Sequence, residues 1–301
     1  MDADLRTPIV VGVDGSPDAG RALRFAVHRA EQVGCGLLLV NAVHEMVPIS
    51  TLGPLIGGET LMEVGREVLA DAVRFVEKTA GTHVVVQTHA ALGPAVPVLA
   101  AAAVDARLVV VGHRPGGALE HLFTGTTAFG VVARARCPVV SVPRGWDGPG
   151  PEARVIAAVD GSATSAEVLA HAVELAAVSS ATVDVVHCWK LGSLYAYLVD
   201  DDLVQKEWGA RTAAVIATFV DECTAARPDV RLTTHLEYAD PVRALVRRSA
   251  HADVLVLGRH DLGPVEGRLA LAAPGSIARA LVQHARCPVE FVPLPAQQRD
   301  R

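Results

Sequence analysis

Short apolar runs alternate along the chain with segments of helical periodicity. In the first half, runs rich in β-branched residues predict strands at about 9–13, 37–43, 83–88, 107–111 and 138–142. Helices are predicted between them, at about 18–33, 60–80, 95–104 and 126–135. Strands that alternate with helices pair in parallel through right-handed crossovers. The pattern therefore predicts an α/β fold in which helices flank a five-stranded, doubly wound parallel sheet.

The second half of the chain repeats the first. The segment Ile9–Ser16, IVVGVDGS, returns as VIAAVDGS at Val155–Ser162, 146 residues later (160 − 14). A join rich in proline and glycine separates the two copies, and such a composition is typical of a linker. We therefore expect two tandem doubly wound domains, at 1–145 and 153–301, with a linker at 146–152.

Composition limits the function classes. The net charge is −6 and no run of Lys or Arg occurs, which argues against a nucleic-acid partner. Five cysteines without a CxxC pattern indicate buried, reduced thiols rather than disulfides or a metal site. The acidic N-terminus lacks the features of a signal peptide, and no apolar stretch reaches the roughly 18 residues of a membrane span. These features predict a cytoplasmic protein that does not enter a membrane.

Candidate chemistry gathers where strands end. In doubly wound sheets, ligands bind outside the carboxyl ends of the strands, at the point where the strand order reverses. Asp14 follows the first strand, Gly112 ends the fourth, and Gly125-Thr126 opens the next helix. Unpaired N–H groups at a helix start attract phosphate, and a glycine allows its close approach. The alternative is that Gly125-Thr126 is only a turn and a helix cap.

These motifs together resemble the universal stress protein family, in its two-domain actinobacterial form. The family signature has a Gly, two residues, a second Gly, nine residues, and then Gly-Ser or Gly-Thr. Gly112 and Gly125-Thr126 match it at the right spacing, and Asp14-Gly-Ser and Arg136-Cys-Pro-Val also resemble the family. The resemblance spans both halves of the chain.

The resemblance implies binding of ATP or another adenine nucleotide, with Mg²⁺ accompanying the phosphates. Asp14 would lie near the adenosine and Val43 against the base. Gly112, Gly125, Thr126 and Thr127 would hold ribose and phosphates, and Arg114 borders the same loop. The equivalent residues of the second copy are Asp160, Gly258, Gly275 and Ser276.

Both copies depart from the signature. In the first, the second Gly is replaced by Pro115, which has no N–H to donate. In the second, 17 positions separate Gly258 from Gly275, against 13 between Gly112 and Gly125. Trp189 stands where the first copy has Val43, and it could either stack on a base or fill the pocket. The first copy is therefore expected to be nearer to a working nucleotide site.

Three functions remain open. The first is a regulatory protein of the stress response that binds ATP and performs no efficient chemistry. The others are a degenerate interaction module without nucleotide and a slow ATPase. No P-loop, dinucleotide-binding or Gly-x-Ser-x-Gly motif occurs, so other enzyme classes lack support.

The resemblance also implies how copies associate. Family members pair through their final strands, here Val139–Val142 and Glu290–Val292, and a homodimer of the whole chain is expected. Glu290 is unusual for a buried strand and is typical of an edge strand.

Overall fold

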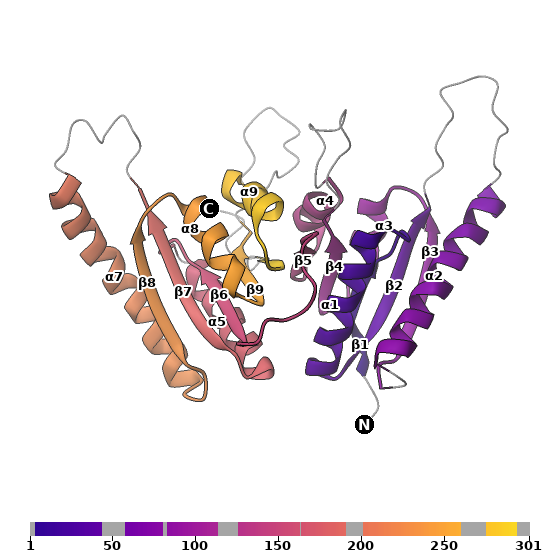
Figure 1. The fold of residues 1–301 in the computed structure, drawn as a ribbon, viewed down its shortest axis with the longest axis horizontal. Coiled ribbons are helices and arrows are strands. Elements are labelled where there is room, and N and C mark those ends of the chain that lie inside the picture. The colour runs from indigo at the N-terminus through magenta and orange to yellow at the C-terminus, as the bar shows by residue number, and fades with distance from the viewer. Residues whose placement is uncertain are drawn as a thin grey trace, which may run out of the picture. The chain divides into compact units, whose positions relative to one another are not determined.

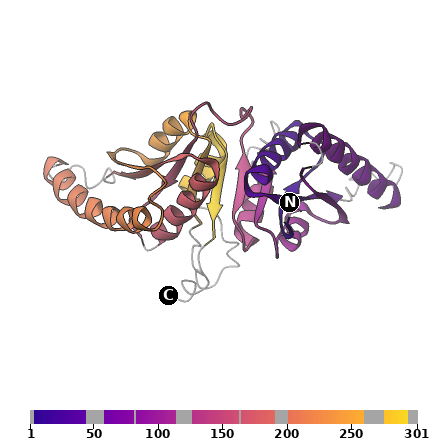
Figure 2. The ribbon, with the colours of Figure 1, turned by 90° about the horizontal axis from the view of Figure 1, so that it is seen from below.

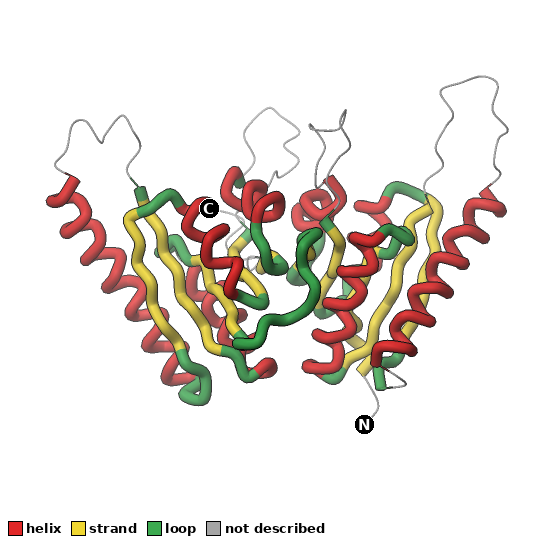
Figure 3. Tube along the Cα trace, in the orientation of Figure 1, coloured by secondary structure: helices red, strands yellow, loops and turns green. Residues whose placement is uncertain are grey.

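The computed structural model describes residues 4–43, 58–80, 83–113, 126–162, 164–190, 201–259 and 275–293 (Figure 1). The chain divides into two compact units, Met1–Gly148 and Pro149–Arg301, called here the first and second units. Helices and strands alternate in both (Figure 3). Among the described residues, no helix combines the length and apolar character needed to cross a membrane.

The first unit is a parallel sheet flanked by helices. Its strands are β1 (Asp4–Gly12), β2 (Cys35–Val43), β3 (Val86–Leu92), β4 (Leu108–Gly112) and β5 (Val139–Val142). Their order is β3-β2-β1-β4-β5, with parallel pairing throughout. Its helices are α1 (Pro17–Val33), α2 (Gly58–Ala80), α3 (Ala95–Ala102) and α4 (Thr126–Arg134). The strands β2 and β3 lie on one side of β1, and β4 and β5 lie on the other. With right-handed crossovers, α1 and α2 therefore cover one face of the sheet and α3 and α4 cover the other (Figure 2).

The second unit repeats this arrangement. Its strands are β6 (Arg154–Ala158), β7 (Thr182–Trp189), β8 (Leu232–Tyr238), β9 (Val254–Gly258) and β10 (Val289–Val292). They lie in the order β8-β7-β6-β9-β10, again in parallel. Its helices are α5 (Thr164–Ser179), α7 (Asp201–Ala226), α8 (Pro241–Arg248), the short 3₁₀ helix η1 (Ser249–His251) and α9 (Ser276–His284). The predicted fold, two tandem doubly wound domains with five-stranded parallel sheets, is confirmed.

Local sequence explains the boundaries of α1. Ser16 caps its start, since its Oγ accepts a hydrogen bond from the Ala19 amide at 3.2 Å. Gly34 ends it in the left-handed conformation, at φ 72° and ψ 37°, and returns its amide to the Ala30 carbonyl. Phe25, on the buried face of this helix, packs edge-to-face on Trp146 with ring centroids 5.6 Å apart. The first part of the predicted linker is therefore joined to the core of the first unit.

The third strand begins and ends later than predicted. Its apolar run suggested residues 83–88, whereas β3 comprises Val86–Leu92 and pairs with β2 from Leu37 to Val43. Gln87, Thr88 and His89 on this strand are exposed. Backbone pairing with a long neighbouring strand outweighs the local apolar run, because each added residue satisfies its own peptide groups.

Glu290 lies on β10, the end strand in the order of its unit, but its side chain is buried, contrary to what a carboxylate on an edge strand suggests. Its side chain is 1% exposed, and its Oε1 lies 2.6 Å from Nε2 of His171 in α5. A carboxylate taken out of water requires hydrogen-bond donors, and His171 is one. The equivalent positions of the first unit, Phe25 and Val140, are apolar. This polar pair is thus specific to the second unit.

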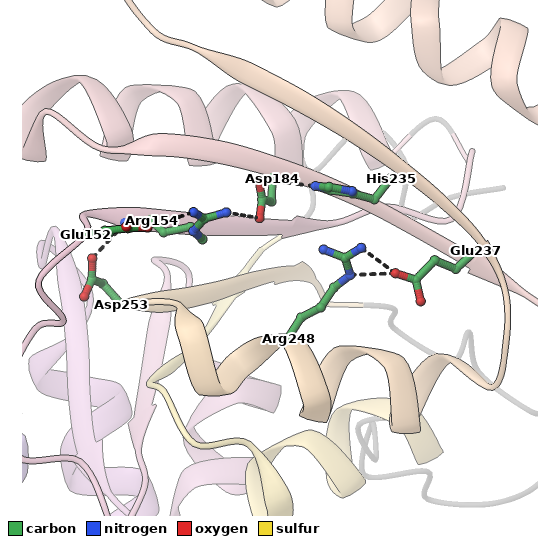
Figure 4. Close-up of polar contacts among 7 residues, drawn as sticks. All are labelled: Glu152, Arg154, Asp184, His235, Glu237, Arg248 and Asp253. Carbon is green, nitrogen blue, oxygen red and sulfur yellow. Dashed lines mark hydrogen bonds and ion pairs between the residues drawn. The ribbon is translucent and has the colours of Figure 1, made fainter.

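Salt bridges from Glu237 of β8 hold α8 against the sheet. The Glu237 carboxylate accepts hydrogen bonds from Arg247 Nη2 and from Arg248 Nε, both at 2.7 Å (Figure 4 shows the pair with Arg248). Burial by itself raises the pKa of Glu237, but the hydrogen bonds and charges of Arg248 and Arg247 outweigh it and hold the pKa below its usual value.

Replacing this carboxylate is expected to have a pH-dependent cost. A group whose pKa is lower in the folded state stabilises it above the unfolded-state pKa, and the contribution is lost as the pH falls through the folded-state pKa. We therefore expect Glu237→Gln to lower the free energy of unfolding by about 1 kcal/mol at pH 7 and by far less at pH 3. Urea unfolding at both pH values measures this. An equal cost at the two values would contradict the assignment.

Candidate functional site

The carboxyl edge of the first sheet carries an exposed carboxylate where the strand order reverses. Asp14 follows β1, and its Oδ1 accepts a hydrogen bond from the Ser16 amide at 2.9 Å. Gly15 between them has φ 78°, a conformation that favours glycine. Within the described part of the chain, this amide is the single donor to Asp14. The carboxylate is therefore fixed in place and still open to further donors.

Gly112 brings the end of β4 against the first turn of α1. A Cβ added there would lie 2.3 Å from the carbonyl oxygen of Asp18 and 3.0 Å from the amide nitrogen of Ala19. Both are backbone atoms of a helix, so no side-chain rotation can relieve the clash. Glycine is thus required for this close approach, which places the β4 end beside the helix start and near Asp14.

The end of β2 forms the neighbouring wall. Asn41 is buried, and its Nδ2 donates to the carbonyl oxygen of Val13 at 2.6 Å, next to Asp14. Val43 is 8% exposed. A Cβ added at Gly65 of α2 would lie 2.7 Å from Val43 Cγ2 and 2.8 Å from Asn41 Oδ1. Gly65 therefore allows α2 to pack closely on this wall.

The second unit holds its equivalent aspartate differently. Asp160 Oδ1 accepts hydrogen bonds from the Ser162 amide at 3.0 Å, from Ser162 Oγ at 2.6 Å and from Ser165 Oγ at 3.0 Å. Ser165 is 1% exposed, and the first unit has Ala19 at this position. Ser162 and Ser165 thus donate to Asp160, whereas within the described residues only the Ser16 amide donates to Asp14.

The ends of β7 and β8 carry an aromatic cluster, formed by His187 and Trp189 of β7 and Tyr238 of β8. His187 is buried, and its Nδ1 lies 2.9 Å from the carbonyl oxygen of Val159, the position that Asn41 takes in the first unit. Trp189 stacks on the His187 ring with centroids 5.5 Å apart and an interplanar angle of 19°. It meets the Tyr238 ring edge-on at 6.1 Å. This cluster is named the aromatic wall.

The end of β9 is less crowded than that of β4. A Cβ added at Gly258 would meet Val168 Cγ2 at 3.2 Å, and no backbone atom is among its nearest neighbours. Gly275 precedes α9 in open space without a side-chain cap, and Ser276 is exposed. The start of α9 therefore presents backbone amides that the chain does not cap through a side chain.

The predicted site residues are only partly within the described chain. Asp14 and Gly112 lie at one edge in the first unit, with Val43 on the adjacent strand. Asp160 and Gly258 share the corresponding edge in the second. Thr127 is half-buried in the first turn of α4, and Thr126 opens that helix, although its side chain is not among those described. Arg114, Pro115 and Gly125 lie outside the described residues.

The sequence prediction missed Asn41, Gly65 and Gly209. A Cβ added at Gly209 would lie 3.2 Å from Cζ2 of Trp189, so this glycine supports the aromatic wall as Gly65 supports Val43. One signal was available, because Asn41 and His187 are polar residues in apolar strands at the repeat offset of 146 (187 − 41). Within the described ranges, His, Cys, Asp and Glu side chains form no group of three or more that could hold a metal ion.

Comparison with known proteins covers both units. The model of the universal stress protein family matches residues 6–143 and 153–293. Universal stress protein Rv2623 of Mycobacterium tuberculosis is 31% identical over 298 residues, which cover 93% of this chain and 94% of that protein. The crystal structure of a universal stress protein from Archaeoglobus fulgidus is 16% identical, covers 98% of both chains and has a TM-score of 0.69. A universal stress protein solved in complex with cAMP covers 46% of this chain at 22% identity and a TM-score of 0.36.

Proposed function

Because this chain belongs to the universal stress protein family, we propose that it is a regulatory protein that binds an adenine nucleotide, ATP foremost, at the carboxyl edge of its strands. The observation that supports this most is the pairing of an exposed, pre-positioned Asp14 with the close approach of Gly112 to the start of α1. A carboxylate accepts hydrogen bonds from ribose hydroxyls. A crevice at the point where the strand order reverses is the usual ligand position in this architecture.

The remaining predicted residues complete the proposal. Thr126 and Thr127 open α4, where backbone amides and hydroxyls suit phosphate oxygens. Val43 offers an apolar contact for the base. Mg²⁺ usually retains several waters and binds through substrate phosphates with one or two carboxylates. An ion held by the phosphates and by water does not need a dedicated metal site at this edge.

The proposed role is regulation through occupancy of the site rather than through turnover. A ligand that binds only the folded unit stabilises it by a free energy that grows with the logarithm of the ligand concentration relative to Kd. The nucleotide-bound and nucleotide-free forms of the protein would then present different surfaces to a partner protein. At most, a slow ATPase activity is expected.

Isothermal titration of the full chain with ATP, ADP, AMP and cyclic AMP tests the proposal. Asp14→Ala is expected to weaken ATP binding about tenfold or more, because a hydrogen bond to a charged group contributes roughly 1.5–3 kcal/mol. Asp105→Ala, an exposed carboxylate between α3 and β4, is the matched control and should leave the affinity unchanged. Absence of binding heat with all four nucleotides would sink the proposal.

A further inference from the structure

The ends of β2 and β7 are the same place in two copies of one fold. The Val13 amide donates to the Val40 carbonyl, and the Val159 amide donates to the Val186 carbonyl, both near 3 Å. Three residues further along each strand, the Val43 carbonyl accepts a hydrogen bond from the Gly93 amide at 2.9 Å. The Trp189 carbonyl likewise accepts one from the Ala239 amide at 3.0 Å. Val43 and Trp189 therefore occupy matching backbone positions, and the difference between the two edges lies in their side chains.

Trp189 is held in the aromatic wall by three contacts. The His187 ring covers one face, the Tyr238 ring meets it edge-on, and Gly209 of α7 lies against its six-membered ring. Its Nε1 is buried without a hydrogen-bond partner within the described residues, which is a cost that the packing of the ring must outweigh. His187 is itself anchored on the Val159 carbonyl. The indole is therefore half-buried and held in place by these neighbours, and the ring face that His187 covers is not available for stacking on a base.

Size and polarity both distinguish the second edge. An indole and a purine are fused bicyclic rings of similar area. An indole at the position equivalent to Val43 therefore takes up about as much space as a base would. Both aspartates are exposed, but the Asp160 carboxylate already accepts hydrogen bonds from Ser162 and Ser165, whereas Asp14 has one donor within the described residues. In the second unit, the position of Val43 thus holds an indole, and the carboxylate equivalent to Asp14 already accepts hydrogen bonds from two serines.

We propose that the chain binds one nucleotide, in the first unit, and that Trp189 excludes the nucleoside from the second. This inference rests on the proposed function. The two copies then have divided roles, with a ligand-responsive first unit and a second unit whose equivalent edge is closed by its own side chains. Trp189 is accordingly a residue that determines which unit is occupied.

Counting bound nucleotide on the full chain tests the inference. Equilibrium dialysis with labelled ATP should give one nucleotide per wild-type chain. Trp189→Val installs the residue of the first unit and should raise the number to two, whereas Trp189→Val combined with Asp14→Ala should return it to one at ATP concentrations that saturate only the unaltered site. Asp105→Ala should leave it at one. A wild-type value of two overturns the inference and leaves the proposed function intact, while a value of zero with every adenine nucleotide overturns the proposed function itself.

A second measurement does not depend on the variant being folded. Wild-type chain is photolabelled with 8-azido-ATP, digested and mapped by mass spectrometry. Label confined to peptides of the first unit, and competed away by ATP, is the expected result. Competed label in peptides from 153–293 overturns the inference. If Trp189→Val is folded by circular dichroism and still binds one nucleotide, the role given to Trp189 is wrong.

Discussion

Gly112→Ala is expected to lower the free energy of unfolding by roughly 3 kcal/mol, at the upper end of the range for over-packed sites. The new Cβ would lie 2.3 Å from the Asp18 carbonyl oxygen and 2.5 Å from its carbonyl carbon. These atoms belong to the first turn of α1, so the strand end and the helix must separate. Because Asp14 lies in the turn that leads from β1 into α1, a shift of α1 should lower the ATP affinity as well. Urea unfolding followed by circular dichroism measures the stability.

Gly258→Ala is the matched control for this substitution. Its nearest neighbour is a side-chain methyl of Val168 at 3.2 Å, which can move by a few tenths of an ångström. We expect a loss below about 1 kcal/mol, since small shifts of a side chain relieve most of the strain. If both variants lose the same free energy of unfolding, the close approach of Gly112 to α1 is not the cause of the destabilisation.

Arg154→Met should destabilise the second unit by about 2–3 kcal/mol. Asp184 of β7 is 7% exposed at its side chain, and its Oδ2 accepts from Arg154 Nη1 at 2.9 Å. Figure 4 shows Arg154 between Glu152 and Asp184, with His235 on the far side at 3.4 Å from Asp184. Removing one partner of a buried ion pair costs about 3–5 kcal/mol, and the lower figure here reflects the one-third exposure of Arg154.

The same site offers a control and a rescue. Arg231→Met removes an exposed guanidinium from the same unit and should change the stability by less than about 0.5 kcal/mol. Arg154→Met combined with Asp184→Leu, the residue of the first unit at position 38, should recover much of the loss because no buried carboxylate remains. Differential scanning calorimetry of the full chain resolves these changes. A double variant as unstable as the single one would contradict the electrostatic explanation.

Arg154 belongs to a group of contacts that holds the start of the second unit. The Asp253 carboxylate accepts hydrogen bonds from the amides of Gly150 at 2.5 Å and Arg154 at 2.8 Å. The hydrogen bond that Arg154 donates to Asp184 is the largest cause of the raised pKa of its guanidinium, which therefore stays charged. The second half of the predicted linker is therefore bound to its own unit, as Trp146 is to the first.

Much of the site could be predicted from the sequence because it depends on local chemistry. Asp14-Gly-Ser and Asp160-Gly-Ser form turns that their own side chains stabilise, as the Asp14 contact with the Ser16 amide illustrates. Gly112 was recognised from its place at the end of an apolar run, although the reason for a glycine there came from a helix 94 residues earlier (112 − 18). Asn41, Gly65 and Gly209 were missed because their partners lie on other elements.

Apolar periodicity and turn residues by themselves determined the order of strands and helices and the duplication, and they predicted the edge where a ligand is expected. These features follow from local backbone preferences and from one rule of chain handedness. Only the tertiary structure decided how each side chain was used. The register of β3 depended on the length of β2, and the burial of Glu290 depended on a histidine 119 residues away. The contacts of Trp189 depended on His187, Tyr238 and Gly209, which lie elsewhere in the sequence. These contacts form between elements that are distant in the sequence. Packing and hydrogen bonding act over a few ångströms, so the spacing of residues along the chain does not predict them.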